Sequence, residues 1–584
     1  MKKLAMLTVK GAIGLVPKAV RKKLKTNHKL TEFYSRSLQR SGLFYGFPSK
    51  KKSAAIYSTF LKYQEKKIKD EGISPSNIKN IRAIVIGESR LLRTVESLRS
   101  AGVDPSVIYV VSSEQTDDSI TRFSNLKAAL NKLHKIGPEF EYTFFINSGD
   151  TLVPETLELM LQRTKSKTTA DASLVYCDTD FINAKKQRVS PHFLPDWNPD
   201  LQLSTAYVST GVMVLNSLLH STDIFASTVA GMVTEMWLKT PNSVIEHVPF
   251  TLVHRDSDRD DFCTELSDIR ALLTKQTESI TAYNEGQGIN HVQWPCNSEP
   301  LVSLIIPTKN GKELVEACIE SILAKTTYQN FEILLIDNGS DEPASLAYFE
   351  ALDKHPKVRV LHYPGVFNYS AINNFGVQHV SEHSRIVGLI NNDIEVIRPD
   401  WLSHMVGHAL REDVGCVGAK LLYSDGRVQH AGVVLGYGGG AGHAHKYFPS
   451  YHPGYMKRLL ATQNYSAVTA ACLLVKKSLF EAVGGLNEKD LAVAFNDVDF
   501  CLRVKETGVR NVYCGEAELY HHESVSRGLD HAPEKAARFN RELTYLKNTW
   551  GQYIEHDPAY NPNLTLKREN FSVKTKEEFS DNQK

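Results

Sequence analysis

The sequence predicts an α/β protein made of two tandem units behind a basic N-terminal arm. Three observations predict this. Apolar strands alternate with helically spaced segments from residue 301, polar residues follow those strands, and the same order recurs more faintly from residue 81. The 584 residues suffice for several domains of ordinary size. We expect a basic, helical arm over 1–79, units over 80–295 and 296–545, and a C-terminal tail over 546–584 that ends in the polar, frayed segment SVKTKEEFSDNQK.

The composition is that of a globular protein. Hydrophobic residues make up 42% of the chain, charged residues 23%, and the net charge is +2, which excludes global disorder and collagen-like or coiled-coil architectures. No apolar run approaches the roughly 18 residues of a membrane span. The N-terminal apolar stretch is interrupted by Lys10 and Pro17, unlike a secretory signal. The eight cysteines form no CxxC pair, so we expect free thiols and a cytoplasmic location.

Positive charge is concentrated at the N-terminus. Residues 1–60 hold fourteen Lys or Arg and only Glu32 as an acid, a balance of +13, so the rest of the chain carries 2 − 13 = −11. Apolar residues recur at near-helical spacing beside these cations, from Leu15 to Leu24. Such a helix can lie on an anionic membrane surface, here the inner face of the plasma membrane, and a solvated basic arm fits the pattern equally well. Nothing resembles a nucleic-acid-binding module, so we expect no nucleic acid as partner.

The elements of the second unit follow one another in a regular order. LVSLIIPTKN (301–310) is an apolar strand, and GKELVEACIESILAK places apolar residues from Leu314 to Ile322 on one helical face. FEILLIDNGSD and SRIVGLINNDIEVI are two further strands, which end at Asp337 and at Asn391-Asn392-Asp393. Ligands bind at the carboxyl ends of strands in open parallel sheets. Asp337 and Asp393 are therefore candidate site residues.

The first unit repeats three of these segments in the same order. They are IRAIVIGESRLLRTVESLRS (81–100), IYVVSSEQTDDS (108–119) and FFINSGDTLVPETL (144–157). The copy differs where chemistry would take place, because Gly87 replaces Pro307 and Ser112 stands opposite Asp337. This pattern predicts a preserved scaffold with an eroded site.

Four segments of the second unit carry groups suited to chemistry, and each has a simpler structural explanation. Asp393 can bind a divalent cation or cap a turn. In FNDVDFCLR, Asp497 and Asp499 should face different ways, so at most one is a general base rather than a helix cap. The LYHHESVSRG segment (519–528) combines imidazoles with Arg527, either as a diphosphate site or as a structural pair. The glycine-rich VQHAGVVLGYGGGAGHAH (428–445) is a turn or a mobile lid over a sugar.

Together these segments resemble glycosyltransferase family 2, in the bacterial two-domain type associated with O-antigen, capsule and other surface polysaccharides. The resemblance spans about 301–528, in family order. It rests on LIIPTKN, LLIDNGS, FNYSAINNFG, LINNDIEV, GCVGAKLLYSDGRVQHAGVV, YSAVTAACLLV, VGGLNEKDLAVAFNDVDFCLRVKETG and AELYHHESVSRG. The segment LVYCDTDFINAKKQRVSPHFLPDWNPDLQLSTAYVST (174–210) resembles the first unit of the same proteins and extends the likeness to about 80–545.

The resemblance implies two GT-A-like (Rossmann-like) domains, a UDP- or dTDP-sugar donor, a divalent metal (Mn²⁺ or Mg²⁺) and a glycan or lipid-linked glycan acceptor. The nucleotide-sugar-binding residues that it implies are Pro307, Thr308, Asn310, Asp337, Asn391, Asn392 and Arg527. The metal ligands that it implies are Asp393 and His521, with His522 as the alternate. Asp497 matches the catalytic base. The chain departs from the family where NND replaces the DxD element, which leaves one acidic ligand, and where Asn496 replaces the Glu of the ED motif.

The implied reaction is an inverting, metal-dependent sugar transfer to a hydroxyl of a growing, lipid-linked bacterial surface polysaccharide. We expect the first unit to be degenerate, because the family's base position falls at Val233 or Thr234 and Glu235 is out of register. Its Ser148-Gly149-Asp150 and Asp178-Thr179-Asp180 segments keep acidic character. The alternative is a non-catalytic glycan-binding or assembly protein with two eroded transferase folds.

Overall fold

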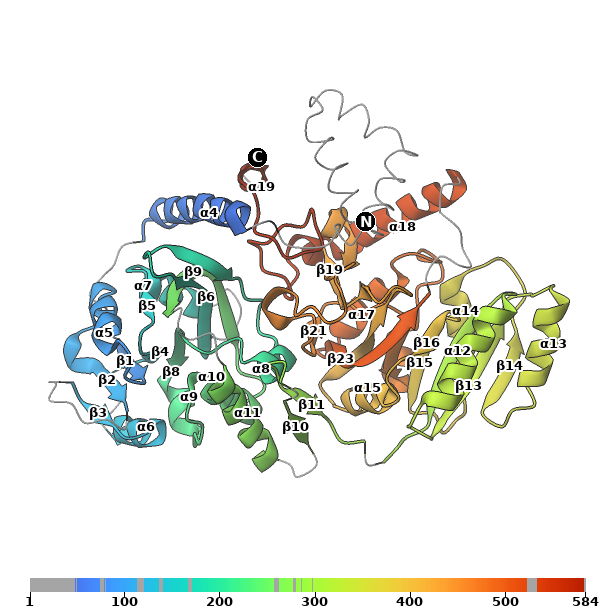
Figure 1. Cartoon of the computed structure of the whole chain (residues 1–584), viewed down its shortest axis with the longest axis horizontal. Helices are drawn as coiled ribbons and strands as arrows, with labels where there is room; N and C mark the ends of the chain where they lie inside the picture. Colours follow the sequence, from blue (N-terminus) through green and yellow to red (C-terminus); the bar gives the residue numbers. More distant parts are fainter. Residues whose placement is uncertain are drawn as a thin grey trace, which may run out of the picture.

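Two α/β domains lie side by side in the computed structural model, with a long helix across one of them (Figure 1). The residues that the structure describes are 48, 50–73, 78, 80–112, 120–135, 140–165, 171–256, 262–276, 280–284, 286–296, 298–522 and 533–581. Over these ranges, no helix combines the length and the apolar character that crossing a membrane requires. Most of the predicted basic arm, residues 1–47, lies outside the described residues.

The first domain is built on a mixed sheet with the strand order β3-β2-β1-β4-β8-β6-β9-β5, and β7 pairs with β6. Its strands are β1 Ile81–Ile86, β2 Ile108–Val111, β3 Arg122–Phe123, β4 Tyr142–Asn147, β5 Thr151–Leu152, β6 Leu174–Ile182, β7 Arg188–His192, β8 Val212–Leu215 and β9 Ile245–Asp256. Its helices are α5 Leu91–Ser100, α6 Leu126–Lys135, α7 Thr156–Thr164, α8 Pro199–Thr205, α9 Asn216–Ser221, α10 Val229–Lys239 and α11 Cys263–Gln276.

The second domain has the order β14-β13-β12-β15-β22-β17-β23-β16, and β18 pairs with β17 while β21 pairs with β23. Its strands are β12 Val302–Thr308, β13 Phe331–Asp337, β14 Val358–His362, β15 Ile386–Ile390, β16 Ile394–Val396, β17 Val414–Leu422, β18 Val428–His430, β21 Gln463–Tyr465, β22 Cys472–Lys476 and β23 Arg510–His521. Its helices are α12 Lys312–Lys325, α13 Pro343–Leu352, α14 Tyr369–Gln378, α15 Trp401–Ala409, α16 Lys477–Ala482 and α17 Asn496–Lys505.

The two sheets have the same topology. Strands β12 to β16 correspond to β1 to β5 in order, β17 and β18 to β6 and β7, and β22 and β23 to β8 and β9. The short strand β5 pairs antiparallel with the long strand β9, with Thr151 opposite His254. In the same way β16 pairs with β23, with Ile394 opposite His521. This confirms the predicted fold class, two tandem GT-A-like α/β domains, and it identifies equivalent positions in the two copies.

The predicted helix after the first strand of the second unit is present as α12. It buries Val315, Cys318, Ile319 and Ile322 against the sheet. Every residue of β12 is buried, because helices cover both faces of its parallel neighbours. The spacing of apolar residues and the lack of alternation in the strand therefore both follow from burial.

Buried polar contacts join the two domains. The Asn198 side-chain amide donates to the Asn464 carbonyl oxygen at 2.8 Å and accepts the Asn464 backbone N–H at 2.9 Å. The Arg411 guanidinium lies 2.6 Å from the Asp200 carboxylate, and both side chains are under 10% exposed. Burial by itself would raise the pKa of Asp200, but Arg411 and Arg510 lower it to about 2. The hairpin of β10 (Thr281–Tyr283) and β11 (His291–Gln293) lies between the domains in sequence.

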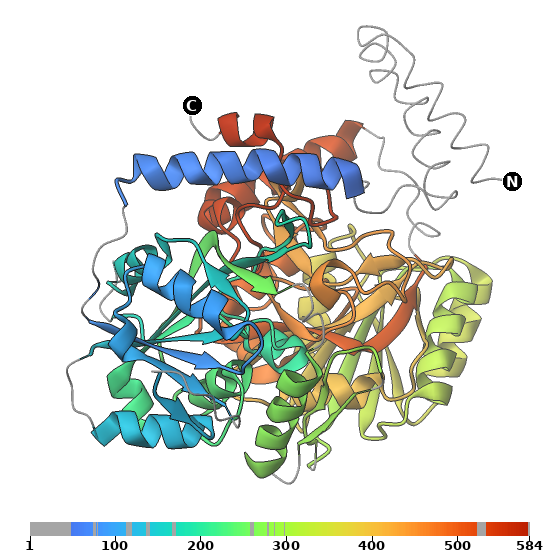
Figure 2. The ribbon, with the colours of Figure 1, turned by 60° about the vertical axis from the view of Figure 1, so that its left-hand side comes forward.

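Helix α4 (Lys50–Asp70) lies against β7 of the first domain and packs on the end of the C-terminal segment (Figure 2). The C-terminal segment contains α18 (Pro533–Glu555) and α19 (Lys576–Asp581). Phe579 of α19 stacks on Tyr63 of α4 at 4.5 Å. Tyr560, Leu564 and Phe571 are buried in the core of the second domain. The expectation that SVKTKEEFSDNQK is frayed is therefore wrong for residues 572–581, because α19 forms there and Phe579 is buried.

Candidate functional site

Asp337 and Thr308 lie together at the carboxyl ends of β13 and β12. Asp337 is buried, and its Oδ1 accepts hydrogen bonds from the backbone N–H and the hydroxyl of Ser340, at 2.9 and 2.5 Å. Its Oδ2 lies 3.2 Å from Nδ1 of His362, whose side chain is 71% exposed. The aligned strand ends place a carboxylate beside an accessible imidazole. A nucleoside would find hydrogen-bonding groups there.

Pro307 and Asn310 shape the turn that follows β12. Pro307 lies in the strand opposite Ile336 of β13. Asn310 has a φ of 53°, a left-handed conformation that Asn tolerates better than most residues. Its Oδ1 accepts the backbone N–H groups of Asp341 and Glu342, at 2.9 and 3.1 Å. The Asn310 side chain thus holds the loop after β13, and its contact with a nucleotide stays a prediction.

Asn391, Asp393 and His521 converge where β15 ends and β16 meets β23. His521 Nε2 lies 3.2 Å from the Asn391 amide nitrogen and 3.2 Å from Asp393 Oδ1. Asp393 and His521 are each 6% exposed. The antiparallel pairing of β16 with β23 brings them together, although 128 residues of chain separate them. The two predicted metal ligands are therefore neighbours.

A chain of hydrogen bonds links this cluster to the other predicted site residues. The Asn392 side chain donates to the Thr308 hydroxyl at 3.0 Å. The Tyr369 hydroxyl lies 3.2 Å from Asn391 Oδ1 and 3.0 Å from the Ala470 carbonyl oxygen. The Ala470 N–H donates to Asp497 Oδ2 at 3.1 Å, which completes the connection to the predicted base.

The two carboxylates of α17 face different environments. Asp499 is 1% exposed, and it pairs with Arg503 at 2.8 Å and accepts the Trp550 indole N–H at 2.9 Å. Asp497 is partly exposed and contacts backbone N–H groups of Ala470 and Val498. Burial raises the pKa of Asp497 above its ordinary value, an effect that these hydrogen bonds oppose. Asp499 has a structural role, and Asp497 is the carboxylate suited to accept a proton.

His522 points away from the cluster, as alternation along a strand requires. Its Nε2 lies 3.1 Å from Glu395 and its Nδ1 lies 2.7 Å from the Ser424 hydroxyl. His521, and not His522, accompanies Asp393. Arg527 lies outside the described residues, so its predicted contact with the diphosphate stays a prediction.

The donor set fits a divalent cation that is shared with a substrate. The part of the chain that the structure describes contains no group of three or more His, Cys, Asp or Glu side chains arranged as a metal site. Mg²⁺ and Mn²⁺ sites in phosphate-transfer enzymes commonly use one or two protein ligands and complete the shell with phosphate oxygens and water. One carboxylate oxygen of Asp393 and Nε2 of His521 match that requirement.

The glycine-rich segment forms a clamped hairpin. Strands β19 (Val433–Leu435) and β20 (Ala441–His443) pair antiparallel. The Leu435 N–H donates to the buried Asp557 carboxylate of the C-terminal segment, at 2.8 Å. The Gly438 N–H donates to the Leu566 carbonyl at 3.3 Å. These contacts favour a structural role over a mobile lid.

His430 lies at the base of this hairpin, and its contact with His443 could not be predicted from the sequence. His430 is fully buried, and burial lowers its pKa to about 3. Its Nδ1 lies 2.9 Å from Nδ1 of His443, and its Nε2 accepts the Gly432 N–H at 3.3 Å. The VQHAG segment gave no spacing signal for this pair.

In the first domain, the positions equivalent to the site are filled by internal contacts. Asp150 corresponds to Asp393, and it accepts the Thr210 hydroxyl at 2.7 Å and the Asp256 N–H at 3.0 Å. Helix α10 begins at Val229, so Ala230 occupies the place of Asp497. The expected register at Val233 or Thr234 lies within one turn of this position and stays a prediction. None of these three positions carries an Asp or Glu.

Two further details of the first unit differ from expectation. Strand pairing aligns Ser112 with Ile336, one position before Asp337, because Ile86 pairs with Val111 while Ile306 pairs with Leu335. Glu235 accepts the backbone N–H groups of Phe225 and Ala226, at 2.8 and 2.9 Å. Glu235 therefore caps a loop.

The Asp178-Thr179-Asp180 segment forms hydrogen bonds with helix α4 and with the C-terminal segment. Asp180 accepts the Tyr57 hydroxyl of α4 at 2.5 Å and pairs with Arg188 and His254, each at 2.7 Å. Asp178 is fully buried and accepts the side-chain amide of Asn561, at 2.9 and 3.0 Å.

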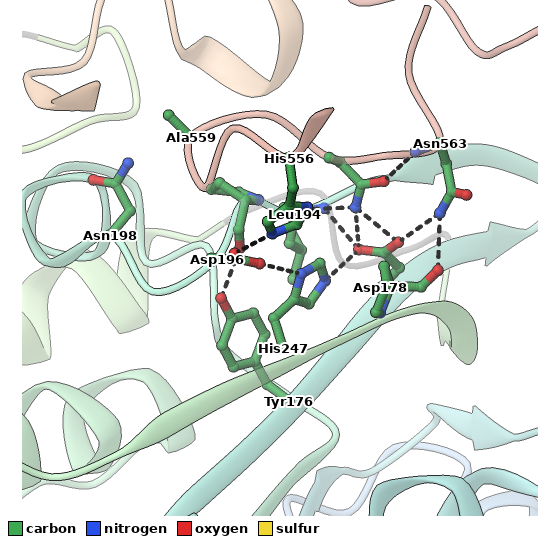
Figure 3. Close-up of polar contacts among 12 residues, drawn as sticks. Tyr176, Asp178, Leu194, Asp196, Asn198, His247, His556, Ala559 and Asn563 are labelled. Carbon is green, nitrogen blue, oxygen red and sulfur yellow. Dashed lines mark hydrogen bonds and ion pairs between the residues drawn. The ribbon is translucent and has the colours of Figure 1, made fainter. Parts of the chain in front are cut away.

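His247 extends this network across the first domain, as Figure 3 shows. Its Nε2 lies 2.9 Å from Asp178, and its Nδ1 lies 3.2 Å from Asp196, which in turn lies 2.9 Å from His556 Nε2. Asp178 and Asp180 therefore form hydrogen bonds and ion pairs within the protein that join the first domain to α4 and to the C-terminal segment.

Comparisons with known proteins give matches to the second domain and to a larger part of the chain. The family described as Glycosyl transferase family 2 matches residues 303–484. An uncharacterized protein of Sinorhizobium fredii is 42% identical over 454 residues, which are 74% of this chain and 49% of that protein. The O-antigen biosynthesis protein RfbC of Myxococcus xanthus is 33% identical over 445 residues, which are 73% of this chain and 34% of that protein. The chain thus spans about half and about a third of the lengths of these relatives.

Solved structures resemble the chain more distantly. A mannosyltransferase from Pyrobaculum calidifontis, in complex with GDP-Man and Mn²⁺, aligns with a TM-score of 0.31 and 16% identity over 42% of this chain and 64% of that one. The family match covers β12 to β22 and the residues that end β12, β13 and β15. The chain therefore carries a glycosyltransferase family 2 domain in its second α/β unit.

Proposed function

We propose that the second domain transfers a sugar from a nucleoside-diphosphate donor to a hydroxyl of a growing bacterial surface polysaccharide, with inversion at the anomeric carbon. The observation that carries the proposal is the hydrogen-bonded connection from Thr308 through Asn391 and Asn392 to His521 and Asp497. It connects the residues proposed to bind the nucleotide, the diphosphate and the metal with the proposed base at one edge of the sheet. The similarity to the O-antigen biosynthesis protein RfbC of Myxococcus xanthus supports the proposal that the product is a surface polysaccharide.

In this proposal each residue has a defined task. Asp337 and Thr308 receive the nucleoside, and Asn391 and Asn392 orient the diphosphate. Asp393 and His521 would hold Mn²⁺ or Mg²⁺, which supplies charge stabilisation to the departing diphosphate. Asp497 accepts the proton of the acceptor hydroxyl as its oxygen bonds to the anomeric carbon from the face opposite the diphosphate. Direct displacement forms one bond and breaks one, so no covalent glycosyl-enzyme is required.

We propose further that the first domain does not transfer sugar and that the acceptor is a lipid-linked glycan on the cytoplasmic side. The internal contacts of Asp150, Asp178 and Asp180 support the first statement. All eight cysteines are free, which supports a reducing compartment. The alternative, a glycan-binding protein with two eroded transferase folds, lacks an observation that favours it over Asp497 and its raised pKa.

The test is calorimetric titration of UDP and of dTDP, with and without Mn²⁺, into wild type and two matched variants. Asp393→Asn changes the proposed site, and Asp150→Asn changes the equivalent position in the first domain. We expect metal-dependent binding that is lost only in Asp393→Asn. Loss only in Asp150→Asn would move the donor site to the first domain. Wild type that binds neither nucleotide would favour the glycan-binding alternative.

A second measurement addresses the base. The variant Asp497→Asn should bind nucleotide normally and lose about 10²–10⁴-fold in kcat, the usual range for a general base. Activity is followed as nucleoside diphosphate released from a panel of UDP- and dTDP-sugars with a glycan acceptor extract. Full activity of the variant would refute the role of Asp497.

A further inference from the structure

The loop that leads into Asp497 is held by a buried carboxylate from another element. Glu542, in the middle of α18, is 2% exposed. Its Oε1 accepts the Val493 N–H at 3.0 Å, and its Oε2 accepts the Ala494 N–H at 3.1 Å. Bonds from backbone amides to a carboxylate are charge-assisted and are stronger than those between neutral groups. The guanidinium of Arg538, one turn earlier in α18, lies 3.8 Å from the Glu542 carboxylate.

The residue between these amides and α17 has a strained backbone. Phe495 has a φ of 59°, a left-handed conformation that is rare for a bulky residue and that costs on the order of 1–3 kcal/mol. Its ring packs against Phe539 of α18, with centroids 5.4 Å apart. Strain of this kind persists only where surrounding contacts hold it. Glu542 and Phe539 therefore act on the three positions, 493–495, that precede Asn496 and Asp497.

The start of the same loop is fixed from the catalytic side. The Ser370 hydroxyl of α14 donates to the Leu491 carbonyl at 2.6 Å. The loop is thus fixed at its start by α14. At the end that carries the base it is held by α18 and by the Asn496 side chain, which donates to the Val493 carbonyl at 3.1 Å. Helix α18 also lies outside the segment that the family matches, residues 303–484.

We propose that Glu542 is a positioning residue for Asp497: its two amide bonds hold the 491–495 loop in the strained path that directs the Asp497 carboxylate toward the acceptor hydroxyl. This rests on the proposed function of Asp497. A neutral side chain cannot replace Glu542 fully, because Gln offers one acceptor oxygen where two amides need one each. The chain directly after α18 is fixed on the first domain, because His556 contacts Asp196 and Asn561 donates to Asp178. The first domain therefore anchors the element that carries Glu542.

The test compares Glu542→Ala and Glu542→Gln with the control Glu534→Ala, which removes an exposed carboxylate from the first turn of the same helix. Each full-length variant is assayed for kcat, for UDP affinity with Mn²⁺, for the pH dependence of kcat, and for hydrogen exchange of the peptide that spans 491–497. We expect Glu542→Ala to lose about 10- to 100-fold in kcat with UDP affinity unchanged. Exchange of the loop amides should rise about tenfold.

The pH dependence separates positioning from general stability. Burial raises the pKa of Asp497, so a loosened loop that admits water should lower it and move the acid limb of kcat to lower pH. A loss of folded protein would reduce kcat at all pH values without moving that limb. Glu542→Gln should fall between wild type and Glu542→Ala in both kcat and exchange, and Glu534→Ala should match wild type.

Three outcomes would overturn the proposal. Unchanged exchange in Glu542→Ala would show that the carboxylate does not hold the loop. Faster exchange with unchanged kcat would show that the loop does not position the base. Reduced kcat with an unmoved acid limb would assign the effect to stability. Failure of the proposed function has a different signature, since Asp497→Asn would then keep full activity, and Glu542 would be left as a structural clamp only.

Discussion

The free energy of unfolding should depend on pH through the protonation of His247. This imidazole is 1% exposed and lies between two carboxylates, 2.9 Å from Asp178 and 3.2 Å from Asp196 (Figure 3). It also stacks on Tyr176 at 5.0 Å. Burial alone would lower its pKa, but the two carboxylates raise the pKa of His247 to about 9. The protonated form is therefore the one that the folded protein stabilises.

The sign and the size follow from linkage. An ordinary histidine has a pKa of about 6.5, so the folded pKa is higher by about 2.5 units, and each unit corresponds to about 1.36 kcal/mol. The contribution of His247 is fully present below pH 6.5 and is lost as the pH rises through 9. Its complete loss should cost about 3 kcal/mol of the free energy of unfolding.

The assay is urea unfolding of wild type and His247→Gln at pH 6.5 and at pH 9.5. Between these values wild type should lose about 3 kcal/mol more than the variant. His383→Gln is the control, because the His383 side chain is 81% exposed and should behave as wild type does. Groups such as cysteines titrate alike in all three proteins and cancel in the comparison. Equal losses in wild type and in His247→Gln would refute the reasoning.

Three further predictions concern packing. Arg411→Met leaves the buried Asp200 carboxylate without its partner at 2.6 Å, so urea unfolding should show a loss of about 3–5 kcal/mol. An unchanged urea midpoint would show that the contact between the domains does not depend on this pair. Phe571→Ala removes a ring that is 1% exposed, so calorimetry should record a loss of about 3–5 kcal/mol; a much smaller loss would mean that the C-terminal segment detaches easily. Asp499→Asn weakens the bond to Arg503 and should cost about 1–3 kcal/mol while initial rates stay at the wild-type level, and a large fall in rate would contradict its structural assignment.

The parts of the fold that the sequence predicts are those with a local signal. The run of apolar residues in β12 and the helical spacing in α12 reflect burial that each segment undergoes by itself. The repeated order of three segments was enough to predict two copies of one sheet. The insertion of β22 between β15 and β17 leaves no such trace, because strand pairing across 82 residues is not encoded in local spacing.

The candidate site divides in the same way. Asp337 and Asp393 follow apolar strands, so their position at the sheet edge could be predicted from the chain alone. His521 came before His522 through the resemblance alone, and the pairing of β23 with β16 places the His521 side chain beside Asp393. Glu542 could not be predicted, because its partners lie 48 and 49 residues earlier and the intervening sequence gives no pattern.

The contact between Asp178 and Asn561 has a consequence for how the chain is made. The two residues are 383 positions apart. At about 5–20 residues per second, a ribosome needs roughly 20–80 s to produce the second after the first. During that interval the Asp178 carboxylate has His247 as a nearby partner in the sequence, but not the amide that completes its hydrogen bonds. The first domain is thus synthesised before the second, but its Asp178 network is completed only after the second domain has been made. A nascent chain that stops before Asn561 leaves the Asp178 carboxylate without this amide.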